Sequence, residues 1–169
     1  RGRGNFSDFE NLTTVEIGDD ATTLPDGMFD GCTKLTTVKI PNSVTAIGEK
    51  AFSGCSDLTS INIPSSVTYI GDFAFSGCKS LTSINIPEGV TSIESNTFNS
   101  CDKLVSINLP SSITHIGARA FYACDSLSDF TIPSSVKTIG NQAFENTAFF
   151  NNKNNWTDNV LYKDGCLLA

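Results

Sequence analysis

A repeat of 23 residues runs through most of this 169-residue chain and leaves few folds open to it. A phenylalanine or a cysteine opens each of six copies, and Thr147 stands where a seventh should begin. The opening residues are Phe9, Cys32, Cys55, Cys78, Cys101 and Cys124. One copy is too short to bury its own apolar side chains, so the copies must stack on one another. The repeat therefore predicts a solenoid.

Each copy reads C-x-x-L-x-x-I-x-I-P-x-x-V-x-x-I-G-x-x-A-F-x-x, with conservative changes. Its alternating start indicates a short, half-buried strand of about five residues and fits the opening of a leucine-rich repeat. A proline without an N–H directly follows five of the strands, at Pro41, Pro64, Pro87, Pro110 and Pro133. We predict a leucine-rich-repeat solenoid with a parallel sheet on one face and extended or loose helical turns on the other.

The two ends of the chain depart from the repeat. We expect residues 1–8 to be an N-terminal flank, residues 9–146 to form the six repeats, and residues 147–169 to form a degenerate repeat and a hairpin cap. Asp164-Gly165 lies between two apolar runs, which is a strong signal for a two-residue hairpin turn. The start of the chain offers no evident cap, so we expect a piece of a longer protein. An exposed terminal coil could then pair end to end with a second copy.

Five of the six cysteines form a row in the repeat, and three interpretations compete for them. Equivalent residues of stacked coils lie about 4.8 Å apart. Parallel side chains at this spacing hold the Cβ atoms too far apart for a disulfide, and a row of five would leave one thiol unpaired. A straight row also cannot surround a zinc ion tetrahedrally. We therefore expect five small, buried, free side chains, while Cys166 lies outside the register.

Charge and hydropathy exclude two kinds of partner. The net charge is −7, and the sequence has no cluster of Lys and Arg that could displace counterions from phosphates. We therefore expect no binding to nucleic acid or to an anionic membrane. The sequence also lacks an apolar run long enough to span a bilayer, so we expect no membrane insertion.

The sequence shows no pattern that indicates catalysis, a metal site or a cofactor. His115 is the only histidine and occupies a variable outward position, where we expect a solvated side chain. The motifs G-x-S-x-G and the glycine-rich phosphate loop are absent. Four acids near the N-terminus match no calcium loop in their spacing: Asp19, Asp20, Asp26 and Asp30. We predict a protein that is not an enzyme.

The outward side of the strands is the surface that a solenoid of this class uses for binding. With the apolar residues pointing inward, the candidate binding residues are Thr14, Glu16, Thr37, Lys39, Ser60, Asn62, Ser83, Asn85, Ser106, Asn108, Asp129 and Thr131. Hydroxyl and amide groups suit a protein ligand, with weak affinity because large apolar anchors are missing. The same residues also suit any exposed strand, and the stacked asparagines could hydrogen-bond to one another. Both interpretations remain open.

The unit CSDLTSINIPSSVTYIGDFAFSG closely resembles the repeat of BspA-like proteins, also called the treponemal-type leucine-rich repeat. The resemblance covers residues 9–146, and the closing NNWTDNVLYKDGCLLA is similar to segments that interrupt or end arrays in this family. The family consists of surface or secreted proteins associated with adhesion to host matrix proteins and with aggregation. The resemblance implies a cell-surface or extracellular adhesion module that binds host proteins or neighbouring cells. The alternative is a structural spacer or stalk without its own ligand.

Overall fold

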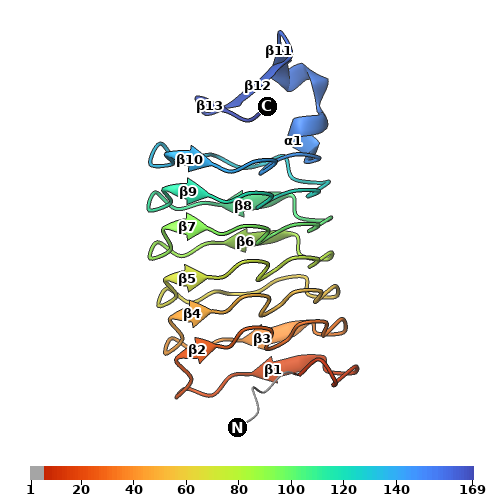
Figure 1. Ribbon diagram of the computed structural model, residues 1–169. Coiled ribbons are helices and arrows are strands. Elements are labelled where there is room, and N and C mark those ends of the chain that lie inside the picture. Colours follow the sequence, from red (N-terminus) through yellow and green to blue (C-terminus); the bar gives the residue numbers. More distant parts are fainter. Residues whose placement is uncertain (1–5) are drawn as a thin grey trace.

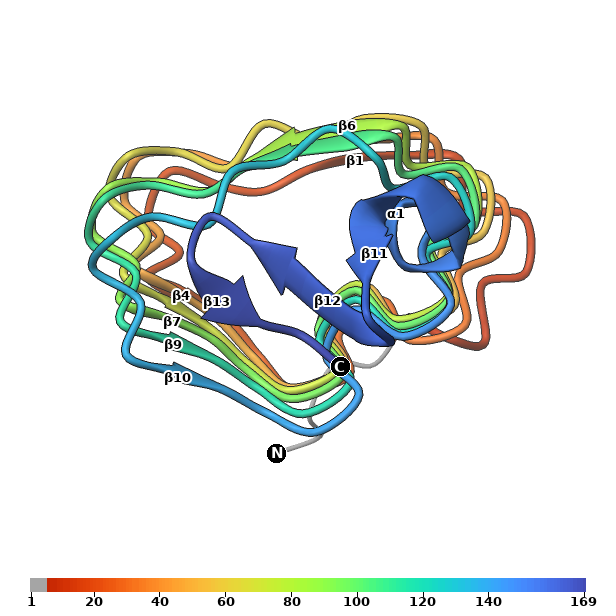
Figure 2. The ribbon, with the colours of Figure 1, turned by 90° about the horizontal axis from the view of Figure 1, so that it is seen from above.

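The structure is a computed structural model that describes residues 6–169. The chain winds as a stack of coils, with the first described coil at one end and the C-terminal segment at the other (Figure 1). Viewed along the stack, successive coils superimpose around a common interior (Figure 2). The predicted leucine-rich-repeat solenoid is therefore confirmed.

The L-x-x-I-x-I part of the repeat forms the predicted parallel strands. They are β1 (Thr14–Glu16), β3 (Thr37–Lys39), β6 (Ser83–Asn85) and β8 (Ser106–Asn108). Each residue pairs with the one 23 positions further on, as Thr14 does with Thr37 and Ser83 with Ser106. These strands have three residues rather than about five. The proline two residues after β3, β6 and β8 offers no amide to extend the ladder, whereas β1 is equally short with Gly18 at this place.

The V-x-x-I segment, expected only to be extended, also pairs between coils and builds further parallel sheets. Its strands are β2 (Thr23–Leu24), β4 (Ala46–Ile47), β5 (Tyr69–Ile70), β7 (Ser92–Ile93), β9 (His115–Ile116) and β10 (Thr138–Ile139). They pair in the orders β2-β4-β5 and β7-β9-β10. The coil is thus hydrogen-bonded to its neighbours on two sides by strands.

The G-x-x-A-F-x-x segment, for which either a loose turn or one turn of helix was expected, forms stacked turns. In these turns the amide of Phe29 donates to the carbonyl of Ala51, and the amide of Phe52 donates to that of Ala74. The coils approach so closely here that a Cβ atom on Gly117 would lie 2.6 Å from the Ser95 nitrogen. Glycine is therefore required at this position by the neighbouring coil rather than by its own dihedral angles.

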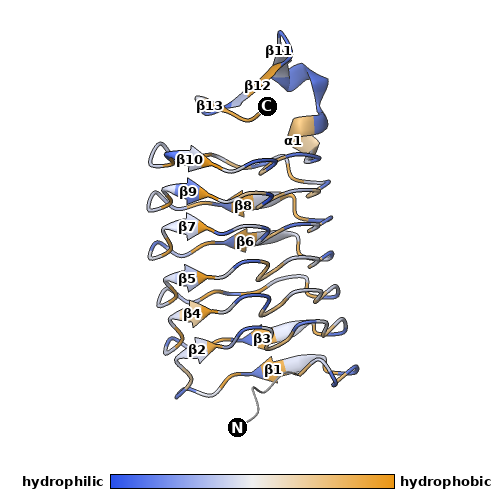
Figure 3. Ribbon diagram, viewed as in Figure 1, coloured by the Kyte–Doolittle hydropathy of each residue, from blue (hydrophilic) through white to orange (hydrophobic). Residues whose placement is uncertain are grey.

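Rows of identical side chains fill the interior. Phenylalanine rings stack from Phe6 to Phe144 with centroids 5.2–5.6 Å apart. Hydrophobic segments recur at the same place in successive coils (Figure 3). Phe6 belongs to this row although the sequence analysis assigned it to the flank, and residues 1–5 of that flank lie outside the described part. The division into flank, repeats and cap stays a prediction.

The C-terminal segment closes the stack. It contains α1 (Ala148–Asn151), a 3₁₀ turn η1 (Lys153–Asn155), and the antiparallel strands β11 (Trp156–Thr157), β12 (Val160–Lys163) and β13 (Cys166–Leu167). Asp164 and Gly165 have positive φ angles, as the predicted two-residue hairpin requires. The helix and the strands lie across the interior of the last coil (Figures 1 and 2).

Candidate binding surface

The twelve candidate residues lie along one side of the solenoid, and we call this set the strand face. Eleven of them are exposed, and Ser106 is half-buried. The intervening Val38, Ile84, Ile107 and Phe130 are buried, and Val15 and Ile61 are half-buried, so the residues between the candidates face the interior as predicted. Ser60, Asn62, Asp129 and Thr131 occupy the same register without belonging to a strand, and Asp129 is joined to Ser106 by a single bridge.

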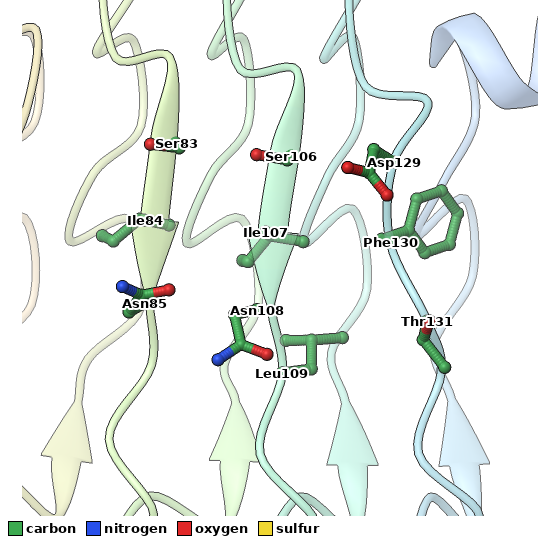
Figure 4. Close-up of a pocket in the computed structure, with 10 residues that line it drawn as sticks. All are labelled: Ser83, Ile84, Asn85, Ser106, Ile107, Asn108, Leu109, Asp129, Phe130 and Thr131. Carbon is green, nitrogen blue, oxygen red and sulfur yellow. The ribbon is translucent and has the colours of Figure 1, made fainter.

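A shallow, open hollow of about 310 Å³ lies on the C-terminal half of the strand face (Figure 4). We call it the Asp129 hollow. Its polar lining comes from three successive coils and consists of Ser83, Asn85, Ser106, Asn108, Asp129 and Thr131. The Asp129 carboxylate makes no hydrogen bond or ion pair within residues 6–169. It is the only charged group among the six.

A second hollow of about 550 Å³ lies on the N-terminal half of the strand face and includes Glu16 and Lys39. Their side chains form an exposed ion pair of 2.8 Å between β1 and β3. The hydrogen bond from Lys39 lowers the pKa of the Glu16 carboxyl and raises that of the Lys39 ammonium. The two charges thus neutralise each other, in contrast to the unpaired charge of Asp129.

The stacked asparagines do not form the amide ladder that one interpretation of the sequence allowed. Asn62, Asn85 and Asn108 are exposed. Across the described residues, no side-chain hydrogen bond joins them to one another or to other groups. Asn85 and Asn108 project from the sheet and line the Asp129 hollow (Figure 4). Their donors and acceptors are therefore available to a ligand.

Val105 borders the strand face and was missed in the sequence analysis. It occupies the row of Thr13, Thr36, Thr59 and Thr82, and its side chain is 47% exposed. Its carbonyl accepts hydrogen bonds from the amides of Ser128 and Asp129, so it lies in the coil next to Asp129. Reading this row across the repeats would have revealed it as the one apolar residue among hydroxyl side chains.

The cysteine row is buried and its thiols are free. Each thiol donates to a phenylalanine carbonyl 26 residues earlier, as Cys78 does to Phe52 over 3.2 Å. Burial raises the pKa of the Cys78 thiol to about 12, and it also raises the pKa of the Cys101 thiol. The interpretation as small core residues agrees with this geometry. Cys166 is half-buried in the cap.

The residues weighed for catalysis or metal binding do not form a site. His115 is half-buried on β9 and hydrogen-bonds to Thr138 of the next coil, so it is less solvated than expected. Among residues 6–169, no group of three or more His, Cys, Asp or Glu side chains is placed to hold a metal ion. No helix within this range has the length and apolar character needed to cross a bilayer.

Comparison with solved structures yields several relatives. A leucine-rich repeat protein of T. pallidum is 32% identical, with a TM-score of 0.73 over 76% of this chain and 60% of its own. A leucine rich cell surface protein of Faecalibacterium prausnitzii is 34% identical, with a TM-score of 0.55 over 83% of this chain and 47% of its own. A protein of Eubacterium ventriosum is 26% identical, with a TM-score of 0.59 over 87% of this chain and 46% of its own.

The chain thus spans between about half and three fifths of the length of the first two relatives. No curated protein matches it. The family described as "BspA type Leucine rich repeat region (6 copies)" matches residues 2–79 and 45–159. On the evidence of these matches and of its 23-residue coils, the chain belongs to the BspA-type leucine-rich repeat family.

Proposed function

We propose that this chain is a non-enzymatic adhesion module that binds proteins of a host or of neighbouring cells through its strand face. The observation that carries the proposal is the state of the polar groups on this face. Asn62, Asn85 and Asn108 stand at the same position of three successive coils, are exposed, and make no side-chain hydrogen bond within the described residues. A row of free amides at a fixed spacing can hydrogen-bond to an extended partner without first breaking internal bonds.

The composition of the strand face favours weak binding by each domain. Protein interfaces draw most of their affinity from buried aromatic and arginine anchors, and the strand face presents neither. Many copies displayed on one surface would raise the overall avidity by orders of magnitude without new contacts. An adhesive role at the cell surface fits this combination.

The family supports a location at the cell surface or outside the cell. The Faecalibacterium prausnitzii relative is described as a cell surface protein. We propose the same location for this chain. Because the chain spans only part of that relative, other regions of the whole protein can carry further activities.

The second candidate function is a spacer or stalk that holds another domain away from the cell. The continuous stack of phenylalanine rings from Phe6 to Phe144 supports it, since such a stack makes a stiff rod. A spacer needs exposed polar side chains only for contact with water and not for a ligand. Binding measurements therefore distinguish the two functions.

The test is binding of the multivalently displayed domain to a panel of host matrix proteins. In the first variant Asn62, Asn85 and Asn108 are each changed to Lys. A matched control adds the same charge elsewhere by changing Thr45, Thr68 and Thr91 to Lys, since these residues are also exposed but lie off the strand face. All three proteins must melt alike.

We expect a panel protein to bind the wild type and the control but not the first variant. Equal loss in both variants would show that added charge alone abolishes binding, and would contradict a role for the strand face. If no panel protein binds the multivalent wild type, the spacer becomes the better explanation.

A further inference from the structure

The repeat is interrupted at two neighbouring positions, one on the strand face and one that borders it. Asp129 stands in the row otherwise formed by Thr14, Thr37, Ser60, Ser83 and Ser106. Val105 stands in the preceding row, where the other five residues are threonine or serine. These positions are exposed, so packing of the core does not require either change.

The two interruptions provide complementary chemistry. The Asp129 carboxylate is exposed and lacks a cationic partner within residues 6–169. Val105, in the adjacent coil and outside the lining of the Asp129 hollow, exposes an apolar side chain, and its carbonyl accepts from the Asp129 amide. Lysine and arginine side chains combine an aliphatic stem with a charged end, and they cover apolar surface while the charge stays in a polar setting.

The remaining groups of the Asp129 hollow favour a cation over other ligands. The carboxylate repels an anion. Phe130 is 4% exposed, so its ring offers little surface for stacking of a flat or sugar ligand. Thr131 on the same coil and Asn108 on the adjacent coil line the same hollow and provide oxygen acceptors, and these can receive the additional N–H groups of an ammonium or a guanidinium.

We propose that the Asp129 hollow seats a lysine or arginine side chain of the partner protein, with its charged end at Asp129 and its stem along Val105. This inference rests on the proposed function and specifies the partner of that site: an extended segment that is polar and carries a basic residue. The other half of the strand face cannot select a charge in the same way, because Glu16 and Lys39 neutralise each other.

The experiment uses extended Ser/Thr peptides with one central residue, which is Arg, Lys, Gln or Glu, displayed at high density on a surface. Wild type is compared with Asp129→Asn and with Asp125→Asn, which makes the same charge change at an exposed acid outside the strand face. Backbone amide shifts of the isotope-labelled chain then locate the bound peptide.

We expect the Arg and Lys peptides to bind more tightly than the Gln peptide and the Glu peptide to bind least. Asp129→Asn should weaken binding of the basic peptides by about fivefold, as for an exposed charge pair, and remove the effect of added salt. Asp125→Asn should bind like wild type. Amide shifts should centre on residues 105–108 and 129–131.

Two results would overturn the inference. One is equal binding of the Arg and Gln peptides to wild type. The other is an equal effect of Asp125→Asn and Asp129→Asn, which would show a general response to net charge. A third result separates the inference from the proposed function. If a matrix protein binds Asp129→Asn as tightly as wild type but does not bind the variant with Asn62, Asn85 and Asn108 changed to Lys, the inference fails while the proposed function stands.

Discussion

The interior of the coil stack and the C-terminal cap both keep apolar side chains away from water, but they do so with different kinds of contact. In the interior, the same few contacts recur from coil to coil. Examples are the hydrogen bond from the Cys78 thiol to the Phe52 carbonyl and the ring stack around Phe75. In the cap, each contact occurs once. Thr147 replaces the cysteine, donates to the Phe144 carbonyl and accepts a hydrogen bond from the Phe150 amide to begin α1. Interior coils are therefore redundant, whereas the cap depends on single contacts.

The cap is fastened to the last coil by the hairpin turn. The Asp164 carboxylate accepts a hydrogen bond of 2.9 Å from the Ile132 amide. The Lys163 ammonium lies 5.5 Å from the ring centroids of both Phe130 and Phe149. These contacts cover the apolar end of the stack, which would otherwise be open to water. A few side chains thus decide whether this end is protected.

The largest difference between the two regions should appear in thiol labelling. The five interior thiols are buried and must wait for unfolding of their coils, whereas Cys166 in the cap is half-buried. We expect Cys166 to react first. The interior thiols should react at least about a thousandfold more slowly. Mass spectrometry of the labelled native protein counts the modified sites. Modification of all six thiols at one rate would contradict the buried row.

Removal of one interior ring should destabilise the stack by more than removal of a ring in the cap. Phe75→Ala creates a cavity in a fully buried row and should cost about 3–5 kcal/mol. Phe150→Ala removes a half-buried ring and should cost about 1–2 kcal/mol. Urea unfolding is followed by circular dichroism for the coils and by fluorescence of Trp156, the single tryptophan, for the cap. Equal costs would mean that the interior row is loosely packed.

Alkaline pH should lower the free energy of unfolding through the interior thiols. The folded pKa of Cys78, about 12, lies above its unfolded value, so its contribution to stability is complete below the unfolded pKa and is lost as pH rises toward 12. At pH 10 this loss should be about 1–2 kcal/mol for Cys78 alone. Melting of wild type and Cys78→Ala at pH 8 and pH 10 measures it. The variant should lose less stability over this interval, and parallel curves would refute the assignment to the thiol.

Loss of the hairpin contact should loosen the cap alone. Asp164→Gly removes the acceptor for the Ile132 amide at a left-handed position that glycine adopts readily, and should cost about 1–2 kcal/mol. Asp158→Gly is the matched control, because Asp158 has the same conformation in the other turn. Hydrogen exchange at the Ile132 amide should accelerate only in Asp164→Gly. Similar exchange in both variants would argue against the contact.

The smallest effect concerns the serine row that follows the strands. Ser66 donates a hydrogen bond of 2.6 Å to the Val44 carbonyl of the preceding coil, whereas the buried hydroxyl of Ser43 has no partner within the described residues. Ser66→Ala should cost about 1 kcal/mol, and Ser43→Ala should be neutral or stabilising. Chemical denaturation of the two variants and of wild type measures these changes in the free energy of unfolding. A larger cost for Ser43→Ala would reverse the interpretation.

The serine row also explains a departure from the commonest leucine-rich repeat. That class has Asn or Cys after the strand, whereas this chain has serine at four of six positions. The hydroxyls of Ser66, Ser112 and Ser135 each donate to a carbonyl 22 residues earlier. The residue type was visible in the sequence, but its partner was not, because a hydroxyl can bond in many directions.

The positions of the candidate residues followed from the repeat, whereas the hydrogen-bonding state of their side chains did not. The outward positions, including Asn85 and Asn108, were predictable because side chains alternate along a strand. Whether their amides bond to each other depends on rotamers, which no sequence pattern determines. The shape of the Asp129 hollow depends on how side chains of three coils lie together, so only the tertiary structure shows it. The place of Val105 in the coil next to Asp129 could have been read from the 23-residue register.

The sequence by itself determined the period, the inward and outward rows, the buried cysteines and the closing hairpin, since spacing and turn chemistry act locally in every copy. The tertiary structure alone decided the second set of parallel strands and the hydrogen bonds from thiols to carbonyls 26 residues earlier. It also decided the packing of the cap against Phe130. These features depend on the exact offset between stacked coils. A repeated sequence requires that coils stack, but side-chain packing across the interface selects which groups meet.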